Sequence, residues 1–121
     1  MTISSKEIAF VIQDAASSKK ARDIVILDMR NLTYFTDYFI ICSGESKVQV
    51  KAIAEEIEKT LDKKDIKLDH IEGYEEANWI LLDYGDVIAH VFYDETRFYY
   101  DLENLWGDAK RVTRKIVEKG V

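Results

Sequence analysis

The 121-residue sequence contains no proline, one cysteine and five glycines. A single cysteine cannot form an internal disulfide, so the chain suits a reducing compartment and we expect a cytoplasmic protein. The apolar runs are far shorter than a bilayer span, which predicts no membrane association. Polar residues open the chain and no long apolar segment follows them, so we expect no signal peptide. With 47% apolar residues, the composition indicates one soluble globular domain.

Residues that bind metals or perform nucleophilic chemistry are also scarce. His70, His90 and Cys42 do not stand at ligand spacings from one another, so we expect no metal site. Cys42 lies in an apolar run, which favours a buried core thiol over a nucleophile. The stretch 43–46 precedes a predicted helix, a place where anions dock, but Glu45 would oppose an anion there. The sequence predicts no catalytic residue and no cofactor.

Positive charge is nearly absent from the middle of the chain. Residues 65–108 carry twelve acidic residues against Lys67 and Arg97, a net charge of −10, whereas residues 1–64 are neutral and residues 109–121 carry +4. Such an acidic segment repels phosphate backbones, so nucleic acid is a poor partner for it and a basic protein surface is a better one. The alternative is a solvated acidic face that keeps the domain soluble.

Helical periodicity appears in two clear segments. Ser4 and Glu7 form a capping box ahead of the first, whose apolar face is Ile8, Val11, Ile12 and Ala15. Ser46 is the predicted N-cap of the second, which extends to about residue 64 with the apolar stripe Val50, Ile53, Ala54, Ile57 and Leu61. A shorter aromatic helix is expected after Asp94, and a basic helix or tail over residues 109–121, outside a domain of residues 1–108.

Strands are predicted between these helices. Residues 23–28 and 38–43 have the β-branched, apolar character of strands buried on both faces, and residues 67–72 form a further strand after the second helix. A strand, a helix and another strand make a βαβ-like unit. The expected fold class is therefore α/β, with a mixed sheet of about five strands flanked by helices.

The best-defined local feature is a hairpin of residues 79–83 and 87–93. Gly85 and Asp86 suit the central positions of a type II′ turn. That register places Tyr84, Leu82 and Ile80 on one uniformly apolar face with Val87, Ala89 and Val91. The other face pairs Asp83 with Ile88, Leu81 with His90, and Trp79 with Phe92. The second face mixes large apolar groups with a carboxylate and an imidazole, which is typical of a binding surface.

Aromatic residues concentrate in the same acidic segment, with nine of the 14 within residues 74–106. Tyr and Trp frequently dominate binding energy at protein interfaces, and a rim of acids selects a basic partner. For Phe92, Phe98 and Trp106 a core role is as plausible as an interface role. Trp79 favours the interface, and His90 is either part of it or a hydrogen-bonded histidine at the sheet edge.

The segment WILLDYGDVIAHVFYDETRFYYDLENLWGDA, residues 79–109, closely resembles the ribosomal silencing factor family, also called Iojap or RsfS. The resemblance extends back through DIVILD (residues 23–28), TDYFIICSG (residues 36–44) and the helix that follows, so it spans about residues 5–109. The hairpin together with the pattern of Tyr100, Leu102, Glu103, Leu105 and Trp106 makes it specific.

The resemblance implies a single α/β domain related in shape to nucleotidyltransferases but without their catalytic residues. It implies a non-enzymatic repressor that binds the large ribosomal subunit through large-subunit ribosomal protein fourteen, blocks joining of the small subunit and lowers translation when nutrients are limiting. It also implies a homodimer when free. Carried onto this sequence, the expected protein-binding residues are Trp79, Leu81, Asp83, Ile88, His90, Tyr99 and Tyr100. Contact of the basic tail with ribosomal RNA is at most weak.

Two other functions stay open at this point. One is a nucleotidyltransferase-like enzyme that holds a phosphate at residues 43–46. The other is an assembly factor of the large subunit, which would use the same surface at an earlier stage.

Overall fold

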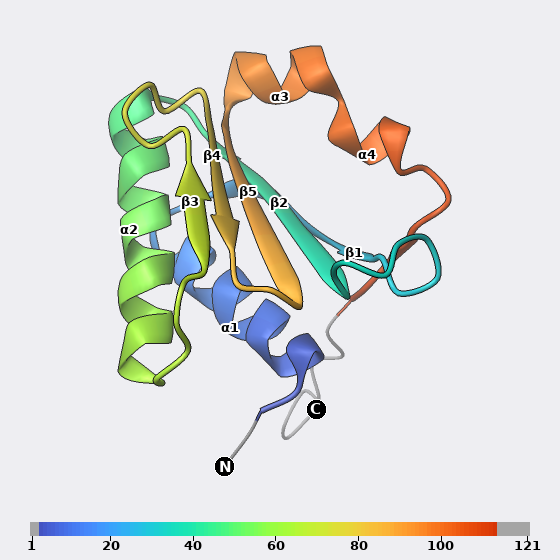
Figure 1. Ribbon diagram of the computed structural model, residues 1–121. Helices are drawn as coiled ribbons and strands as arrows, with labels where there is room; N and C mark the ends of the chain where they lie inside the picture. Colours follow the sequence, from blue (N-terminus) through green and yellow to red (C-terminus); the bar gives the residue numbers. More distant parts are fainter. Residues whose placement is uncertain (1–2, 114–121) are drawn as a thin grey trace, which may run out of the picture.

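The computed structural model describes residues 3–113, which form one mixed sheet with helices on both sides (Figure 1). The elements are α1 (Ser5–Ser18), β1 (Arg22–Asp28), β2 (Tyr38–Gly44), α2 (Lys47–Lys63), β3 (His70–Glu72), β4 (Trp79–Asp83), β5 (Val87–Tyr93), α3 (Asp94–Tyr100), α4 (Leu102–Leu105) and β6 (Lys110–Arg111). The strand order is β3-β4-β5-β2-β1-β6. The predicted α/β class is confirmed. None of the helices within residues 3–113 has the length and hydrophobicity of a membrane span.

Helices α1 and α2 begin where the predicted caps place them. The Ser4 hydroxyl accepts a hydrogen bond from the Glu7 amide at 3.2 Å, and the Ser46 hydroxyl accepts one from the Gln49 amide at 3.1 Å. Both helices lie against one face of the sheet (Figure 1). The predicted stripe of α2 is completely buried, whereas α1 buries a shifted set, Ala9, Ile12, Ala15 and Ala16. Three of these four residues are alanines.

The β4–β5 hairpin has the predicted register. Ile80 pairs with Val91 and Leu82 with Ala89, and all four side chains are buried beneath α1 and α2. At the turn the Tyr84 amide donates to the Val87 carbonyl at 2.9 Å, and Gly85 has a φ of +86°. A positive φ at the first central residue is what a type II′ turn requires, and glycine adopts it without a steric cost.

The connection from β2 through α2 to β3 is the predicted βαβ-like unit, since β3 runs parallel to β2, but the two strands are not neighbours. Strand β3 lies at the sheet edge, separated from β2 by β5 and β4. The parallel neighbour of β2 is β5, with Tyr38 opposite Val87 and Gly44 opposite Tyr93. The expected strand over residues 67–72 is shorter than predicted, since residues 70–72 alone pair with β4.

Two predictions about the other edge of the sheet are wrong. Strand β1 is not buried throughout: Arg22 and Asp23 are exposed, because a bulge between Arg22 and Val25 shifts the register and gives Asp23 a φ of +48°. Lys110 and Arg111 form a sixth strand that pairs with Asp28 and Leu27, where a basic helix or tail was expected. The rest of that predicted segment, from residue 114, lies outside the described residues.

Candidate protein-binding site

The face of the sheet opposite α1 and α2 carries the residues that the sequence singled out. Strand alternation places Trp79, Leu81 and Asp83 of β4 on this face, opposite Phe92, His90 and Ile88 of β5. Helices α3 and α4 lie on the same side (Figure 1). A second, smaller apolar layer forms there from Leu27, Met29, Phe39, Ile41, Ile88, Phe92 and Leu102. The sheet is therefore covered on one face by two long helices and on the other by one short segment.

Trp79 is the centre of an aromatic group on this face. Its ring centroid lies 4.8 Å from that of Phe92 and 5.0 Å from that of Tyr100, both in tilted geometry. Tyr100 in turn meets Tyr99 edge to face at 5.1 Å. Such pairs add to the energy of apolar burial, so the group is preorganised. Trp79 is half-buried, and its exposed part lines a hollow at the surface.

His90 lies beneath this group and is 4% exposed. The Trp79 indole N–H donates to His90 Nδ1 at 3.1 Å, and the Phe39 ring lies 4.5 Å away in edge geometry. Burial disfavours the imidazolium and lowers the pKa of His90 to about 4. The side chain is therefore neutral at pH 7 and, because Nδ1 accepts, carries its proton on Nε2. It orients Trp79 from below.

Helix α3 exposes its aromatic side chains instead of burying them. Tyr99 is 80% exposed and Tyr100 52%, and none of the residues of α3 is buried. Phe98 and Leu105 nearby are also largely exposed. Trp79, Tyr100 and Tyr99 contact one another in turn, and exposed aromatic groups of this kind are typical of interaction sites. We call Trp79, Tyr99 and Tyr100 the aromatic surface.

A hollow of about 560 Å³ lies beside the aromatic surface. Its lining combines Trp79, Tyr99 and Tyr100 with the carboxylates of Glu76 and Glu95. Aromatic faces and carboxylates together suit a lysine or arginine side chain, which an aromatic ring attracts through its quadrupole and a carboxylate through its charge. The chemistry of this hollow favours a basic partner.

Arg97 fixes α3 to the sheet. Its guanidinium donates to the Arg22 carbonyl (3.2 Å), the Ser43 hydroxyl (3.2 Å) and the Asp23 carbonyl (2.7 Å), and it pairs with Glu103 at 2.8 Å. The β1 bulge leaves these two carbonyls available. Burial alone would raise the pKa of Glu103, but the Arg97 hydrogen bond and charge outweigh it and lower that pKa. The sequence did not single out Arg97, although it is one of two bases in the acidic segment.

The chain matches one known protein family over nearly its whole length. The model of a family described as "Ribosomal silencing factor during starvation" matches residues 2–120. The chain belongs to this family. It is 44% identical over 110 residues to the ribosomal silencing factor RsfS of Halalkalibacterium halodurans, covering 91% of this chain and 94% of that protein. It is 46% identical over 107 residues to the RsfS of Bacillus subtilis, covering 88% and 91%.

Solved structures agree with the fold. A crystal structure of a protein from Bacillus halodurans has a TM-score of 0.82 and 40% identity, and the match covers 91% of this chain and all of that one. The crystal structure of protein CV0518 from Chromobacterium violaceum has a TM-score of 0.85 and 32% identity, with 98% of both chains covered. The family resemblance inferred from residues 79–109 is thereby confirmed.

The seven expected contact residues divide into two groups by their exposure to solvent. Tyr99 and Tyr100 are exposed, and Trp79, Leu81 and Asp83 are partly exposed, so all five are accessible to a partner. Ile88 and His90 are buried, at 8% and 4% exposure, so each offers little surface to a partner. Of the two, His90 contacts the aromatic surface directly, through its hydrogen bond to Trp79. The strand pattern alone could not show this, because the cover comes from elsewhere in the chain.

The loop before α2, where a nucleotidyltransferase-like enzyme would hold a phosphate, uses its polar groups internally. The Ser43 hydroxyl accepts from Arg97, and the Ser46 hydroxyl caps α2. The Glu45 amide donates to the Gln49 side chain at 2.7 Å, and the Glu45 carboxylate pairs with Arg22. An anion here would displace these bonds and meet the Glu45 charge, so the geometry does not favour phosphate binding.

Cys42 is a core residue, as the sequence predicted. It belongs to β2, and its side chain packs in the core between the sheet and helices α1 and α2. Burial raises the pKa of its thiol to about 12. The thiolate, which is the nucleophilic form, is therefore negligible at neutral pH. Among the described residues, no group of three or more His, Cys, Asp or Glu side chains has a metal-binding arrangement.

Proposed function

We propose that this chain binds the large ribosomal subunit through large-subunit ribosomal protein fourteen, with the aromatic surface as the contact. Bound there, it blocks joining of the small subunit by steric exclusion and lowers translation when nutrients are limiting. The observation that carries the proposal is the exposed pair Tyr99 and Tyr100 beside half-buried Trp79, in a chain that belongs to the ribosomal silencing factor family.

Charge supports a basic protein as the partner. The aromatic surface belongs to the segment of net charge −10, and Glu76 and Glu95 line the hollow next to it. Ribosomal proteins are basic, so complementary fields would steer the encounter and select the orientation. A complex in the micromolar to nanomolar range needs about 8 to 12 kcal/mol, which a few aromatic hot spots supply.

A steric mechanism needs no reacting group. It requires a surface that binds tightly and a body large enough to occupy the space of another particle. This requirement agrees with the internal use of the polar groups at Ser43 and Ser46 and with the protonated, buried thiol of Cys42. The function we propose is therefore binding and exclusion, in the cytoplasm, without a cofactor.

Sedimentation of ribosomal subunits tests the proposal. The wild-type chain is expected to travel with large subunits and to reduce the yield of joined ribosomes. The double variant Tyr99→Ala/Tyr100→Ala removes exposed rings, so its fold is retained while binding falls by tenfold or more, as expected for hot spots. Tyr34→Ala is the matched control, because Tyr34 is fully exposed in the loop before β2, at the opposite end of that strand from α3.

Wild-type protein that stays at the top of the gradient, or that travels with large subunits without changing subunit joining, contradicts the proposal. Binding to precursor particles in place of mature subunits points to the assembly-factor alternative.

The homodimer is a further part of the proposal. An exposed aromatic patch suits self-association in the absence of a partner. If the same surface serves both purposes, Tyr99→Ala/Tyr100→Ala makes the free chain monomeric in sedimentation equilibrium. A double variant that remains dimeric places the dimer contact elsewhere.

A further inference from the structure

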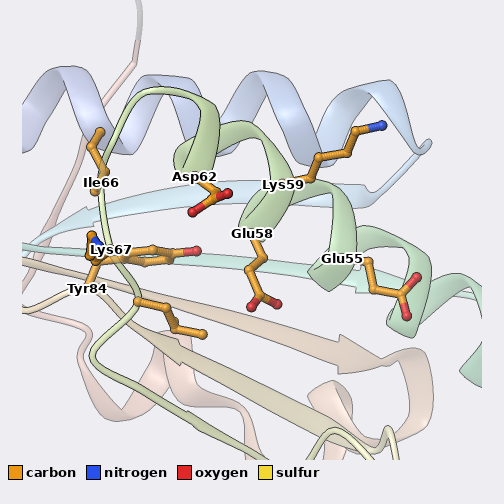
Figure 2. A pocket seen from close by; sticks show the side chains of 8 residues that line it. Glu55, Glu58, Lys59, Asp62, Ile66, Lys67 and Tyr84 are labelled. Atoms are coloured by element: carbon orange, nitrogen blue, oxygen red, sulfur yellow. The ribbon is translucent and has the colours of Figure 1, made fainter.

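A second hollow lies far from the aromatic surface in the fold, between α2 and the chain that leads into β3. Its volume is about 530 Å³, in the range of sites for small ligands. Three acidic residues of α2 line it, together with Lys59, Lys67, Ile66, Leu68 and Tyr84. Figure 2 shows these side chains around the groove. We refer to it as the α2 groove.

Tyr84 contributes an unpaired polar atom to the α2 groove. The residue is 9% exposed, and its hydroxyl has no hydrogen-bond partner among the described residues. In Figure 2 the hydroxyl points toward the gap between Asp62 and Glu58. Burial and these two carboxylates raise the pKa of Tyr84, so the phenol stays protonated. A buried hydroxyl without a partner is costly, and a ligand that reaches it removes that cost.

The acidic side chains form a row and not a cage. Glu55, Glu58 and Asp62 follow one face of α2, where the rise of a helix separates successive members by about 4.5 and 6 Å along the axis. Within residues 3–113, no group of three or more His, Cys, Asp or Glu side chains converges on one point as metal ligands do, and these three acids are no exception. A point-like divalent cation therefore matches the groove poorly, and an extended cation matches it well.

The availability of the carboxylates differs along the row. Glu55 accepts a hydrogen bond from the Tyr74 hydroxyl. No ion pair involves Glu58 or Asp62 among residues 3–113, and Lys59 extends away from the groove in Figure 2. The free pair thus lies at the Tyr84 end, next to the apolar side chains of Ile66 and Leu68. An occupant needs ammonium groups and a methylene chain between them.

We propose that the α2 groove binds a linear aliphatic polyamine. One ammonium donates to Glu58, Asp62 and the Tyr84 hydroxyl, and a second, joined to it by methylenes that follow the row, reaches Glu55. Ammonium nitrogens joined by three or four methylenes are roughly 5 to 6 Å apart by standard bond lengths, close to the spacing of the row. This inference is independent of the ribosome-binding proposal and does not need a ribosome for its test.

Calorimetric titration of the full-length chain with spermidine, at 0.15 M monovalent salt, tests the site. Saturable binding is expected, weakened by tenfold or more in Tyr84→Phe and in Glu58→Gln, because a hydrogen bond to a charged group is lost in each. Glu56→Gln is the matched control: Glu56 is on α2 outside the groove and bonds to Thr60, and its loss removes the same charge. Its affinity for spermidine is expected to stay within twofold of wild type.

The melting temperature of each variant without ligand shows whether lost binding is due to unfolding. Tyr84→Phe removes an unpaired hydroxyl, so its melting temperature without ligand is expected to equal or exceed that of wild type, which excludes unfolding as the cause of lost binding. Absence of saturable binding overturns the proposal. So does equal weakening in Glu56→Gln, or magnesium ions binding as tightly as spermidine, since either outcome indicates general charge attraction. An arginine-rich peptide that binds where spermidine does not also overturns it and identifies a protein occupant.

Discussion

Replacing Arg97 tests how the aromatic surface is held in place. The guanidinium joins α3 to β1, β2 and α4 through four hydrogen bonds, one of them the ion pair with Glu103. The Arg97 and Glu103 side chains are 11% and 20% exposed, so solvent screens the pair only in part. Arg97→Ala removes all four bonds and leaves the Glu103 carboxylate without its partner.

The size of the loss follows from these contacts. Removing one partner of a hydrogen bond to a charged group costs about 1.5 to 3 kcal/mol, and leaving a partly buried carboxylate unpaired adds to it. Relaxation of α3 toward solvent recovers part of this energy. We therefore expect Arg97→Ala to lower the free energy of unfolding by about 3 kcal/mol. Arg97→Lys keeps the charge but loses the planar fork, so it is expected to recover less than half of the loss.

Urea unfolding at pH 7, followed by circular dichroism, measures this difference. Arg30→Ala is the control: Arg30 pairs with Asp28 at 2.7 Å but is far more exposed than Arg97, so a much smaller change is expected. Large-subunit binding by Arg97→Ala should weaken too, since Tyr99 and Tyr100 lose their fixed position. A loss below about 1 kcal/mol, or one no greater than that of Arg30→Ala, refutes the anchoring role.

Three further predictions concern single residues. Burial lowers the pKa of His90 from 6.5 to about 4, so the free energy of unfolding is highest above pH 6.5 and falls by about 3 kcal/mol as the pH drops from 6.5 toward 4. Urea unfolding of wild type and His90→Gln at pH 7 and pH 4.5 measures this loss, which is expected to be larger in wild type. An equal loss in both proteins contradicts the assignment. Gly73→Ala should destabilise far more than Gly85→Ala in thermal unfolding, because a Cβ at Gly73 would lie 2.1 Å from the Trp79 carbonyl oxygen, whereas at Gly85 it meets a flexible Asp69 side chain at 3.3 Å; equal losses would show that the positive φ alone matters. Labelling of Cys42 by a thiol reagent at pH 8 should proceed at the rate of unfolding, and rapid labelling of folded protein would contradict its burial.

The parts of the fold that depend on neighbouring residues were predictable from the sequence. Ser4 and Ser46 cap their helices, and Gly85 sets the hairpin and with it every pair along β4 and β5. These signals act over a few residues, so a local pattern contains them. The same holds for Cys42, whose apolar neighbours in β2 indicated a buried thiol.

The parts that depend on distant segments were not predictable. Lys110 and Arg111 become a strand because the edge of β1 is open to them, and two residues carry no strand pattern of their own. His90 is buried by Phe39 and Trp79, which the alternation along β5 cannot reveal. The separation of β3 from β2 by two strands likewise depends on the hairpin that comes later in the chain.

The accessibility of the aromatic side chains was predicted better than the contacts that hold them in place. Aromatic density and acidic charge pointed to Trp79, Tyr99 and Tyr100, which are accessible in the structure. Arg97 was missed because its partners, two backbone carbonyls and Glu103, are brought to it by a bulge with no sequence signature. A lone arginine in an acidic segment was the signal that could have identified it.

Direct titration of purified large-subunit ribosomal protein fourteen into the labelled chain tests the central claim. The wild-type chain and the Tyr34→Ala control are expected to bind with the same Kd, and Tyr99→Ala/Tyr100→Ala is expected to bind at least tenfold more weakly. The affinity should fall as salt increases, because acidic residues flank the aromatic surface. Equal affinity of the double variant and the wild type, or no binding of protein fourteen by the wild-type chain, would contradict the account.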